Sequence, residues 1–354
     1  MRNLAYLLMS GVLLCASSSS AQQAAAPPIP PAQASRATQP PQRMRFAPQF
    51  VPGQVLRYQM EFRTTTESRR TGLVEDPQAP SQLEMTWSAV VRLEVLGVAT
   101  DASGRAATST GAGEGGRMRL RTTYEKSVAT SRSDTYDPAG AALEEQYRKL
   151  EGRTLQYVLD AEGKVSDVEG LQEIVADEKA ASAARDWLAQ LAVSTSLPQG
   201  GIVPGQKWSS EQPATSAPLA GLLWRTESTY LRDEPCRPIA AAGAASEAGL
   251  PSGESCAVIL TRFVMRDGRA RGDPTPDEYR RRGLRTAGTW SGSGESLAYI
   301  SLRSGWVVSL TQTGSEEMDV TVSTADGQSS VRYAGRVRSQ SQVTLLSESP
   351  AAVR

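Results

Sequence analysis

The sequence predicts a mainly β protein of the α+β class, built of two related antiparallel sheets or half-barrels with a central helical connector. Three observations predict this fold. Apolar residues alternate with polar residues over long stretches, one set of residues occurs twice with the same spacing, and a helical period lies between the two copies.

Residues 1–21 have the features of a secretory signal peptide. Arg2 supplies a positive charge, residues 4–16 form an apolar run too short to span a bilayer, and Ser19-Ser20-Ala21 offers a small-residue cleavage site. Cys15 follows a leucine where a lipid-modification site has a small residue, so we expect export to the periplasm or medium, with a lipid anchor at Cys15 as the less favoured alternative. No later apolar run reaches the about 20 residues of a transmembrane helix.

Residues 22–50 are expected to be a disordered tether. This segment holds seven prolines among Gln, Ala, Ser and Arg. Such a composition buries too little apolar surface to offset the conformational entropy of the chain. The roughly 300 residues that follow are enough for a sizeable core in one or two domains.

Alternation of apolar and polar residues is the strongest secondary-structure signal. It runs through residues 82–96 and through residues 56–62, and it predicts strands with one face on a core. We expect further strands near residues 118–124, 224–231, 256–265, 297–302, 306–311, 318–322 and 331–345. Thr311 to Glu317 has no such alternation and is predicted to be an exposed turn, with Glu316 and Glu317 in solvent.

Two segments have a helical period. Asp137-Pro138 suits the start of a helix that places Leu143, Tyr147 and Leu150 on one stripe and ends at Gly152. A second helix is expected between Gly170 and Ser196, and residues 169–198 are predicted to connect the two halves.

The duplicated pattern divides the chain into halves at residues 51–168 and 199–348. The sextet of Gly152, Leu155, Tyr157, Gly163, Val165 and Val168 recurs as Gly294, Leu297, Tyr299, Gly305, Val307 and Leu310. Val51-Pro52-Gly53 likewise recurs as Val203-Pro204-Gly205. Each sextet is predicted to be a β-hairpin, and we expect its tyrosine to belong to the core rather than to stack on a ligand.

Cys236 and Cys256 are the cysteines that remain after signal removal, and we expect them to form a structural disulfide. The loop 236–256 that they close is rich in Ala, Gly, Ser and Pro. Their spacing differs from the Cys-x-x-Cys of redox pairs.

Chemistry is restricted by the absence of histidine from the whole sequence. This absence excludes Ser-His-Asp and Cys-His catalysis and histidine-ligated metal sites. The sequence also lacks Ser-x-x-Lys, Gly-x-Ser-x-Gly and a glycine-rich phosphate loop, so we expect no cofactor or metal site. An enzyme is the third-ranked function class, and it would need a carboxylate pair that faces a cleft. The formal net charge is zero, which predicts no nucleic-acid partner.

One segment departs from this balance of charge. The Arg262–Arg285 loop is rich in arginine, including Arg280, Arg281 and Arg282. Guanidinium groups suit carboxylates and phosphates, so these three are candidate anion contacts; the alternative is a solvated loop.

The Val-Pro-Gly-Gln turns, the Gly-x-x-Leu-x-Tyr hairpins and the intervening helix resemble exported bacterial proteins grouped as a domain of unknown function, over about residues 50–347. The resemblance implies export and a duplicated β-rich fold. The expected architecture is also loosely similar to bacterial lipoprotein carriers, in which a curved sheet wraps a helix.

We therefore predict an exported, non-enzymatic envelope protein that binds an apolar or amphipathic ligand, such as lipid, on concave sheet faces. The candidate ligand contacts, each also explicable as plain core, are Tyr58, Trp87, Tyr124, Trp224 and Tyr299. The alternative is a structural protein that engages another envelope protein through strand edges or the Arg262–Arg285 loop.

Overall fold

The structure is a computed structural model. It describes residues 43–44, 46, 49–72, 82–99, 117–134, 138–160, 165–173, 197–198, 200–214, 218–236, 254–268 and 272–349. The signal peptide, most of the proline-rich tether and most of the connecting helix predicted from the sequence lie outside these residues.

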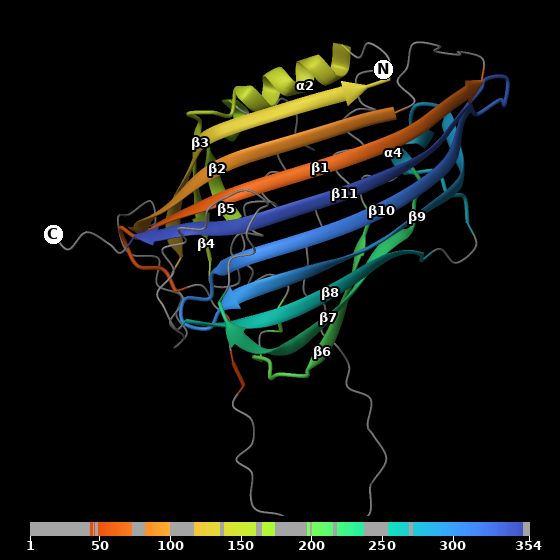
Figure 1. The fold of residues 1–354 in the computed structure, drawn as a ribbon. Helices are drawn as coiled ribbons and strands as arrows, with labels where there is room; N and C mark the ends of the chain where they lie inside the picture. Colours follow the sequence, from red (N-terminus) through yellow and green to blue (C-terminus); the bar gives the residue numbers. More distant parts are fainter. Residues whose placement is uncertain are drawn as a thin grey trace, which may run out of the picture.

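Eleven strands form one antiparallel sheet in the order β5-β4-β3-β2-β1-β11-β10-β9-β8-β7-β6 (Figure 1). In chain order the strands are β1 Val55–Gly72, β2 Gln82–Val98, β3 Met118–Ser133, β4 Thr154–Leu159, β5 Val165–Glu169, β6 Lys207–Pro213, β7 Leu222–Pro235, β8 Ser255–Asp267, β9 Leu284–Ser301, β10 Val307–Thr324 and β11 Ser330–Ser349. The helical elements are α2 Pro138–Arg148, α4 Asp277–Arg280 and the 3-10 turn η2 Leu171–Glu173. The prediction of a mainly β, antiparallel fold is confirmed.

The two expected sheets are joined into one because the first strand pairs with the last. Strands β1 and β11 are antiparallel neighbours in the middle of the sheet, with pairs that run from Val55↔Ser349 to Gly72↔Val331. Strands β1–β5 spread from this seam to one edge, and β11 back to β6 spread to the other. The far edges β5 and β6 therefore belong to consecutive strands of the chain.

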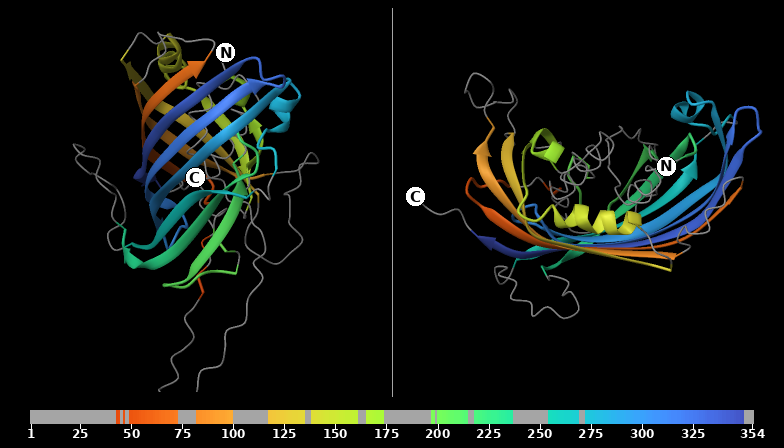
Figure 2. Two further views of the ribbon diagram at one scale, coloured as in Figure 1. Left: turned by 90° about the vertical axis from the view of Figure 1, so that its right-hand side faces the viewer. Right: turned by 90° about the horizontal axis from the view of Figure 1, so that it is seen from above.

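The sheet is curved into a trough, and α2 lies inside it (Figure 2). Successive side chains of a strand point to opposite faces, so the strand register assigns each residue to the inner or the outer face. The pairs Met60↔Ala89 and Met60↔Val343 carry the inner face across β2, β1 and β11. The next row on the outer face is polar and consists of Ser88, Glu61 and Gln342.

Helix α2 also shields one edge of β3. Strand β4 pairs with β3 only from Met118 to Thr123, which leaves the rest of that edge without a strand. There the Glu151 carboxylate accepts from the backbone N–H of Ser127 at 3.2 Å, and the Glu144 carboxylate accepts from that of Ser131. Two glutamates thus replace the carbonyl groups of a missing neighbour strand.

Both Val-Pro-Gly-Gln sequences form the same turn. Gly53 and Gly205 have φ of 83° and 84°, values that favour glycine. The carbonyl of Gln54 accepts from Val95 N–H at 2.9 Å, and that of Gln206 accepts from Tyr230 N–H at 3.0 Å. These turns start β1 and β6, so the start of each half is built alike.

The sextets, in contrast, face opposite ways. Both form antiparallel hairpins, β4–β5 and β9–β10. Tyr157 lies opposite Leu120 on the inner face and is 1% exposed. Tyr299 lies opposite Val258 and Ser309 on the outer face and is half-buried. The matched residues therefore do not pack alike in the two halves.

The predicted turn at Thr311–Glu317 is wrong. These residues continue β10 without interruption, with partners on both β9 and β11. The alternation is hidden because the inward positions of this segment are Gln312, Gly314 and Glu316, none of them apolar.

The disulfide between Cys236 and Cys256 is confirmed, with an S–S distance of 2.04 Å and a Cα–Cα distance of 4.9 Å. It joins the end of β7 to the start of β8. Residues 237–253 of the loop that it closes lie outside the described residues.

The last residues of the proline-rich segment pack onto the sheet. Met44 forms a backbone bridge with Ile202, and the ring of Phe46 meets that of Tyr230 edge-on, with centroids 5.8 Å apart. These apolar side chains tie the segment before β1 to the second half of the chain.

Candidate ligand-binding face of the sheet

The inner face of the trough has two main buried apolar regions and one smaller cluster. The larger one is centred on β1, β2, β3 and β4 and includes Leu56, Tyr58, Val91, Leu93, Leu120 and Tyr157. Trp306, from the β9–β10 turn, packs into this region and is 1% exposed. The second region, at the opposite ends of β7, β8 and β10, includes Leu222, Trp224, Phe263, Met265 and Val320. A third small cluster surrounds Tyr230 and Ile259.

Three of the five candidate ligand contacts lie together in the first region. Tyr58 is fully buried and Tyr124 is 6% exposed. Burial raises the pKa of the Tyr124 hydroxyl, and the neighbouring Tyr147 and Tyr157 raise it further. Both candidates are positioned as core side chains.

Trp87 lies at the border of the same region and is half-buried. Its Nε1 donates to Ser127 Oγ at 3.0 Å, and its ring centroid lies 5.4 Å from that of Tyr147 on α2. The indole thus joins the helix to the sheet and leaves part of its surface open on the inner face.

Trp224 and Tyr299 are remote from these three. Trp224 lies in the second region, 9% exposed, with its ring edge-on to that of Phe263 at 5.8 Å. Tyr299 faces the outside of the sheet. The structure therefore brings together Tyr58, Trp87 and Tyr124 and separates the other two.

Between the apolar regions the inner face is lined by small polar residues. One row of paired residues runs across β11, β10, β9, β8 and β7 as Ser341, Gln312, Ser296, Thr261 and Ser228. Ser228 and Thr261 share a hydrogen bond of 2.8 Å, and Ser210 and Thr226 share one of 2.6 Å in the next row. Hydroxyl groups that bond to one another leave this floor of the trough uncharged.

Glu316 is the functional candidate that the sequence reasoning missed. It sits in the middle of β10 on the inner face, where Gly292 of β9 and Val337 of β11 are its strand partners. Its carboxylate accepts from Trp290 Nε1 at 3.0 Å, and burial raises its pKa to about 7, against the lowering effect of this hydrogen bond. The signal that could have found it is the alternation of Met318, Val320 and Val322 later in β10. Extended backwards by two residues, this alternation places Glu316 on the same inner face.

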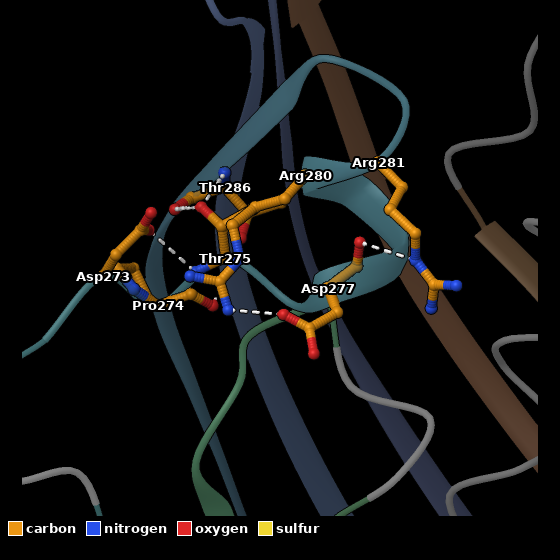
Figure 3. A network of polar contacts seen from close by, with 7 residues as sticks. All are labelled: Asp273, Pro274, Thr275, Asp277, Arg280, Arg281 and Thr286. Carbon is orange, nitrogen blue, oxygen red and sulfur yellow. Dashed lines mark hydrogen bonds and ion pairs between the residues drawn. The ribbon is translucent and has the colours of Figure 1, made fainter.

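The candidate anion contacts lie at the tip between β8 and β9. Arg280 binds the Asp277 carboxylate at 2.6 Å, and Arg281 Nε donates to the Asp277 carbonyl at 3.4 Å (Figure 3). Arg282 is exposed. Helix α4 begins at Asp277, so Arg280 is already partnered within its own turn.

The same tip is fixed by two buried threonines. Thr286 N–H donates to Thr275 Oγ1 at 3.0 Å, and Thr275 N–H donates to the Asp273 carboxylate at 2.9 Å (Figure 3). The hydrogen bonds from Thr275, followed by the charges of Arg280 and Arg285, hold the pKa of Asp273 below its usual range.

The Arg262–Arg285 segment is not one loop. Residues up to Asp267 belong to β8 and residues from Leu284 belong to β9. The strand continues because Phe263 and Met265 alternate inward. Arg262 points outward, 3.8 Å from Glu295.

The outer face carries a shallow groove of about 510 Å³ over β9, β10, β11 and β1. Its side chains are mainly hydroxyls and arginines, among them Arg63, Ser293, Thr313, Ser315 and Arg338. Arg63 is paired with Glu84 at 3.0 Å. This surface differs sharply from the inner face in having no aromatic lining.

Within the described residues, no group of three or more histidine, cysteine, aspartate or glutamate side chains could hold a metal ion. No helix in that part of the chain is long and apolar enough to cross a membrane.

No protein-family model and no curated protein sequence matches the chain. Among solved structures, the chain is similar to a lipovitellin determined for its lipid–protein interactions, with 10% identity and a TM-score of 0.43. The alignment covers 86% of this chain and 26% of that one, so the chain spans about a quarter of the lipovitellin polypeptide. A likeness at this level carries no argument about function, and the resemblance to exported proteins of unknown function stays a prediction.

Proposed function

We propose that this protein binds an apolar or amphipathic ligand against the inner face of its curved sheet. The observation that carries the proposal is the partial exposure of apolar side chains on the inner face near the central seam. Apolar side chains there are half-buried rather than enclosed, among them Phe62, Trp87, Leu310, Met318, Val337 and Val343. By the strand register they share the face of Met60, which is the inner face of the trough.

The energetics favour such a ligand. Covering apolar surface contributes about 25 cal/mol for each Å² removed from water. Ligand sites of this type are concave and mostly apolar, with a few polar groups that fix orientation. The row of hydroxyls and Gln312 supplies polar groups of that kind between the two apolar regions.

We further propose that the protein works outside the cytoplasm. Its disulfide supports this, because disulfides persist in oxidising compartments and are rare where thiols are kept reduced. The signal-like residues 1–21 point the same way.

A matched pair of variants tests the ligand proposal. Phe62 points into the trough and its neighbour Arg63 points outward, opposite Trp87 and Thr86 respectively on β2. In calorimetric titrations with dodecanol, Phe62→Ala should weaken binding about tenfold, in line with the 1.5–3 kcal/mol of a buried phenyl ring. Arg63→Ala should bind as the unchanged protein does. Absence of dodecanol binding to the unchanged protein, and of acyl chains in its organic extract, would overturn the proposal.

A second candidate function is a structural role through the open edges of the sheet. Strands β5 and β6 each pair with one neighbour among the described strands, which leaves an edge for strand addition. An affinity capture from envelope extract tests this role together with Arg280, Arg281 and Arg282. If the same partners are captured after all three arginines are changed to Ser, the arginines are not the binding surface.

A further inference from the structure

Glu316 breaks the pattern of the face on which it lies. The other inward residues of the central rows are apolar, hydroxyl-bearing, glycine or glutamine, whereas Glu316 places a carboxyl group on the floor of the trough. The next residue, Glu317, points outward and pairs with Arg336 of β11. Among the described residues, Glu317 therefore has a cation partner and its neighbour Glu316 has none.

Aromatic rings surround the carboxyl group. Trp290 donates to it, and Trp224 lies over the neighbouring glycine of β9. A Cβ atom at Gly292 would lie 2.5 Å from Trp224 Cη2 and 3.2 Å from Glu316 Cγ, so both side chains occupy the space above this glycine. Phe263 fills the corresponding space above Gly294, where a Cβ atom would lie 2.4 Å from its Cζ. The two glycines thus leave room close to the sheet for the Trp224 and Phe263 rings and for the Glu316 side chain.

No cation of the described strands balances this carboxyl group. Its hydrogen-bond donor within the described residues is Trp290 Nε1, a neutral group. Arg336 and Arg338 of β11 point to the outer face. On the inner face, Arg70 lies on β1 in the row of Val320 and stacks on Tyr333, with its guanidinium carbon 5.7 Å from the ring centroid. A positive charge at Glu316 must come from outside these strands.

We propose that Glu316, Trp290 and Trp224 hold the cationic head group of an amphiphile, an alkylammonium, whose apolar chain lies along the inner face of the sheet. The proposal rests on the proposed function and names the ligand class for it. A carboxylate supplies the opposite charge, and indole faces attract ammonium groups through their quadrupole. Phe263, Met318 and Val320 continue the apolar surface beside the head group.

The charge state of Glu316 then sets the affinity. Because its pKa is about 7 in the free protein, the carboxyl group is largely protonated under acidic conditions and must lose a proton to bind a cation. Affinity is therefore full above about pH 7 and falls as the pH drops below it. Besides Glu316, the charged side chains that face inward on the neighbouring strands are Asp267 at the exposed end of β8 and Arg70 on β1.

Three ligands with one chain length and different head groups test the proposal. Dodecyltrimethylammonium, dodecanol and dodecyl sulfate are titrated into the full protein by calorimetry at pH 8, below their micellar concentrations. We expect the ammonium compound to bind at least tenfold more tightly than dodecanol, and the sulfate more weakly than both. Glu316→Gln should reduce ammonium affinity to that of dodecanol and leave dodecanol unchanged. Glu317→Gln, which alters the adjacent outward carboxylate, should change neither.

A pH series gives an independent readout. Below pH 7, ammonium affinity should fall in the unchanged protein, by at most about tenfold per pH unit, until it reaches the affinity for dodecanol, and it should stay flat in Glu316→Gln. Trp290→Leu removes the indole face and keeps Glu316, so it should weaken ammonium binding and retain the pH slope. Far-ultraviolet circular dichroism verifies that each variant is folded.

The outcomes separate the two proposals. Equal binding of the ammonium compound and dodecanol, with no effect of Glu316→Gln, would overturn the head-group site and leave the apolar ligand site standing. Failure of all three compounds to bind would overturn both. Loss of ammonium binding in Glu317→Gln as well would also overturn the assignment, because that side chain lies on the other face.

Discussion

At the scale of single residues, the face to which a side chain points decides its role more than its chemical type does. Glu316 and Glu317 are consecutive glutamates, yet one lies beside Trp290 inside the trough and the other pairs with Arg336 outside it. Tyr157 and Tyr299 match in the repeated pattern and differ in the same way. A surface ion pair contributes only about 0–1 kcal/mol to the free energy of unfolding. A carboxylate that is removed from water lowers that free energy unless its charge is balanced.

The raised pKa of Glu316 predicts a pH-dependent stability of definite sign. The folded protein holds this proton more tightly than the unfolded chain, whose ordinary glutamate pKa is 4.5. The contribution of this bound proton to the free energy of unfolding is therefore fully present below about pH 4.5 and is lost as the pH rises toward about 7. Glu316→Gln should raise the free energy of unfolding by about 1–3 kcal/mol at pH 8 and by little at pH 4.5. Urea denaturation at the two pH values measures this, and an equal effect at both would contradict it.

The glycines beneath the aromatic rings are a second residue-scale test. A Cβ atom at Gly294 would lie 2.2 Å from the Thr313 carbonyl oxygen and 2.4 Å from Phe263 Cζ. Gly294→Ala should therefore lower the free energy of unfolding by about 1–3 kcal/mol through overpacking. Ser293→Ala, at the exposed outward neighbour, should change it by less than about 0.5 kcal/mol. Equal urea midpoints for the two variants would contradict this prediction and show that the Thr313 backbone and the Phe263 ring both shift without cost.

At the scale of elements, α2 acts as a cover for the unpaired edge of β3. Glu144 on the helix and Glu151 just after it accept hydrogen bonds that a neighbouring strand would otherwise accept. An exposed strand edge is a template for association with other chains, and a helix that covers it removes that hazard. The same helix packs Tyr147 on Trp87, so one element both covers the edge of β3 and covers part of the inner face of the trough.

Two adjacent glutamates of α2 distinguish this role from a general surface effect. Glu144 binds the Ser131 amide, whereas Glu145 is exposed and pairs with Arg148 at 2.7 Å. Glu144→Ala should accelerate hydrogen exchange at the Ser131 amide and destabilise the protein by about 1 kcal/mol. Glu145→Ala should leave that amide protected. Unchanged exchange in Glu144→Ala would mean that the edge is shielded by something other than its carboxylate.

At the scale of the whole molecule, the central seam makes the two halves one sheet. The β1–β11 pairs run without a break from Tyr58↔Leu345 to Gly72↔Val331. We expect the halves to unfold together. Variants that keep only Trp87 in the first half or only Trp290 in the second should show the same urea midpoint by fluorescence. Two separate midpoints would show instead that each half is an independent unit.

The sequence predicted what depends on neighbours along the chain. Strands β1 and β2 were predictable because Tyr58, Met60, Val91 and Leu93 alternate with polar residues that face water. The turns before β1 and β6 were visible as Val-Pro-Gly-Gln. Alternation fails as a guide through Gln312, Gly314 and Glu316, where the inward side chains are not apolar.

What the sequence did not predict depends on contacts between distant segments. Nothing local to Val55 or Ser349 indicates that their strands pair, so two sheets were expected where the structure has one. The environment of Glu316, which was predicted to lie in solvent, was missed for the same reason. Glu316 lies beside Trp290, 26 residues earlier in the chain, and its environment is created by the pairing of β9 with β10.

The pairing of the first strand with the last has a consequence for biosynthesis. Strand β1 emerges from the ribosome early, but its partner β11, Ser330–Ser349, is made after every other described strand. The middle of the sheet therefore cannot close until β11 has been made. A chain of this topology completes its structure slowly, because the contacts at its centre join strands that are far apart in the sequence.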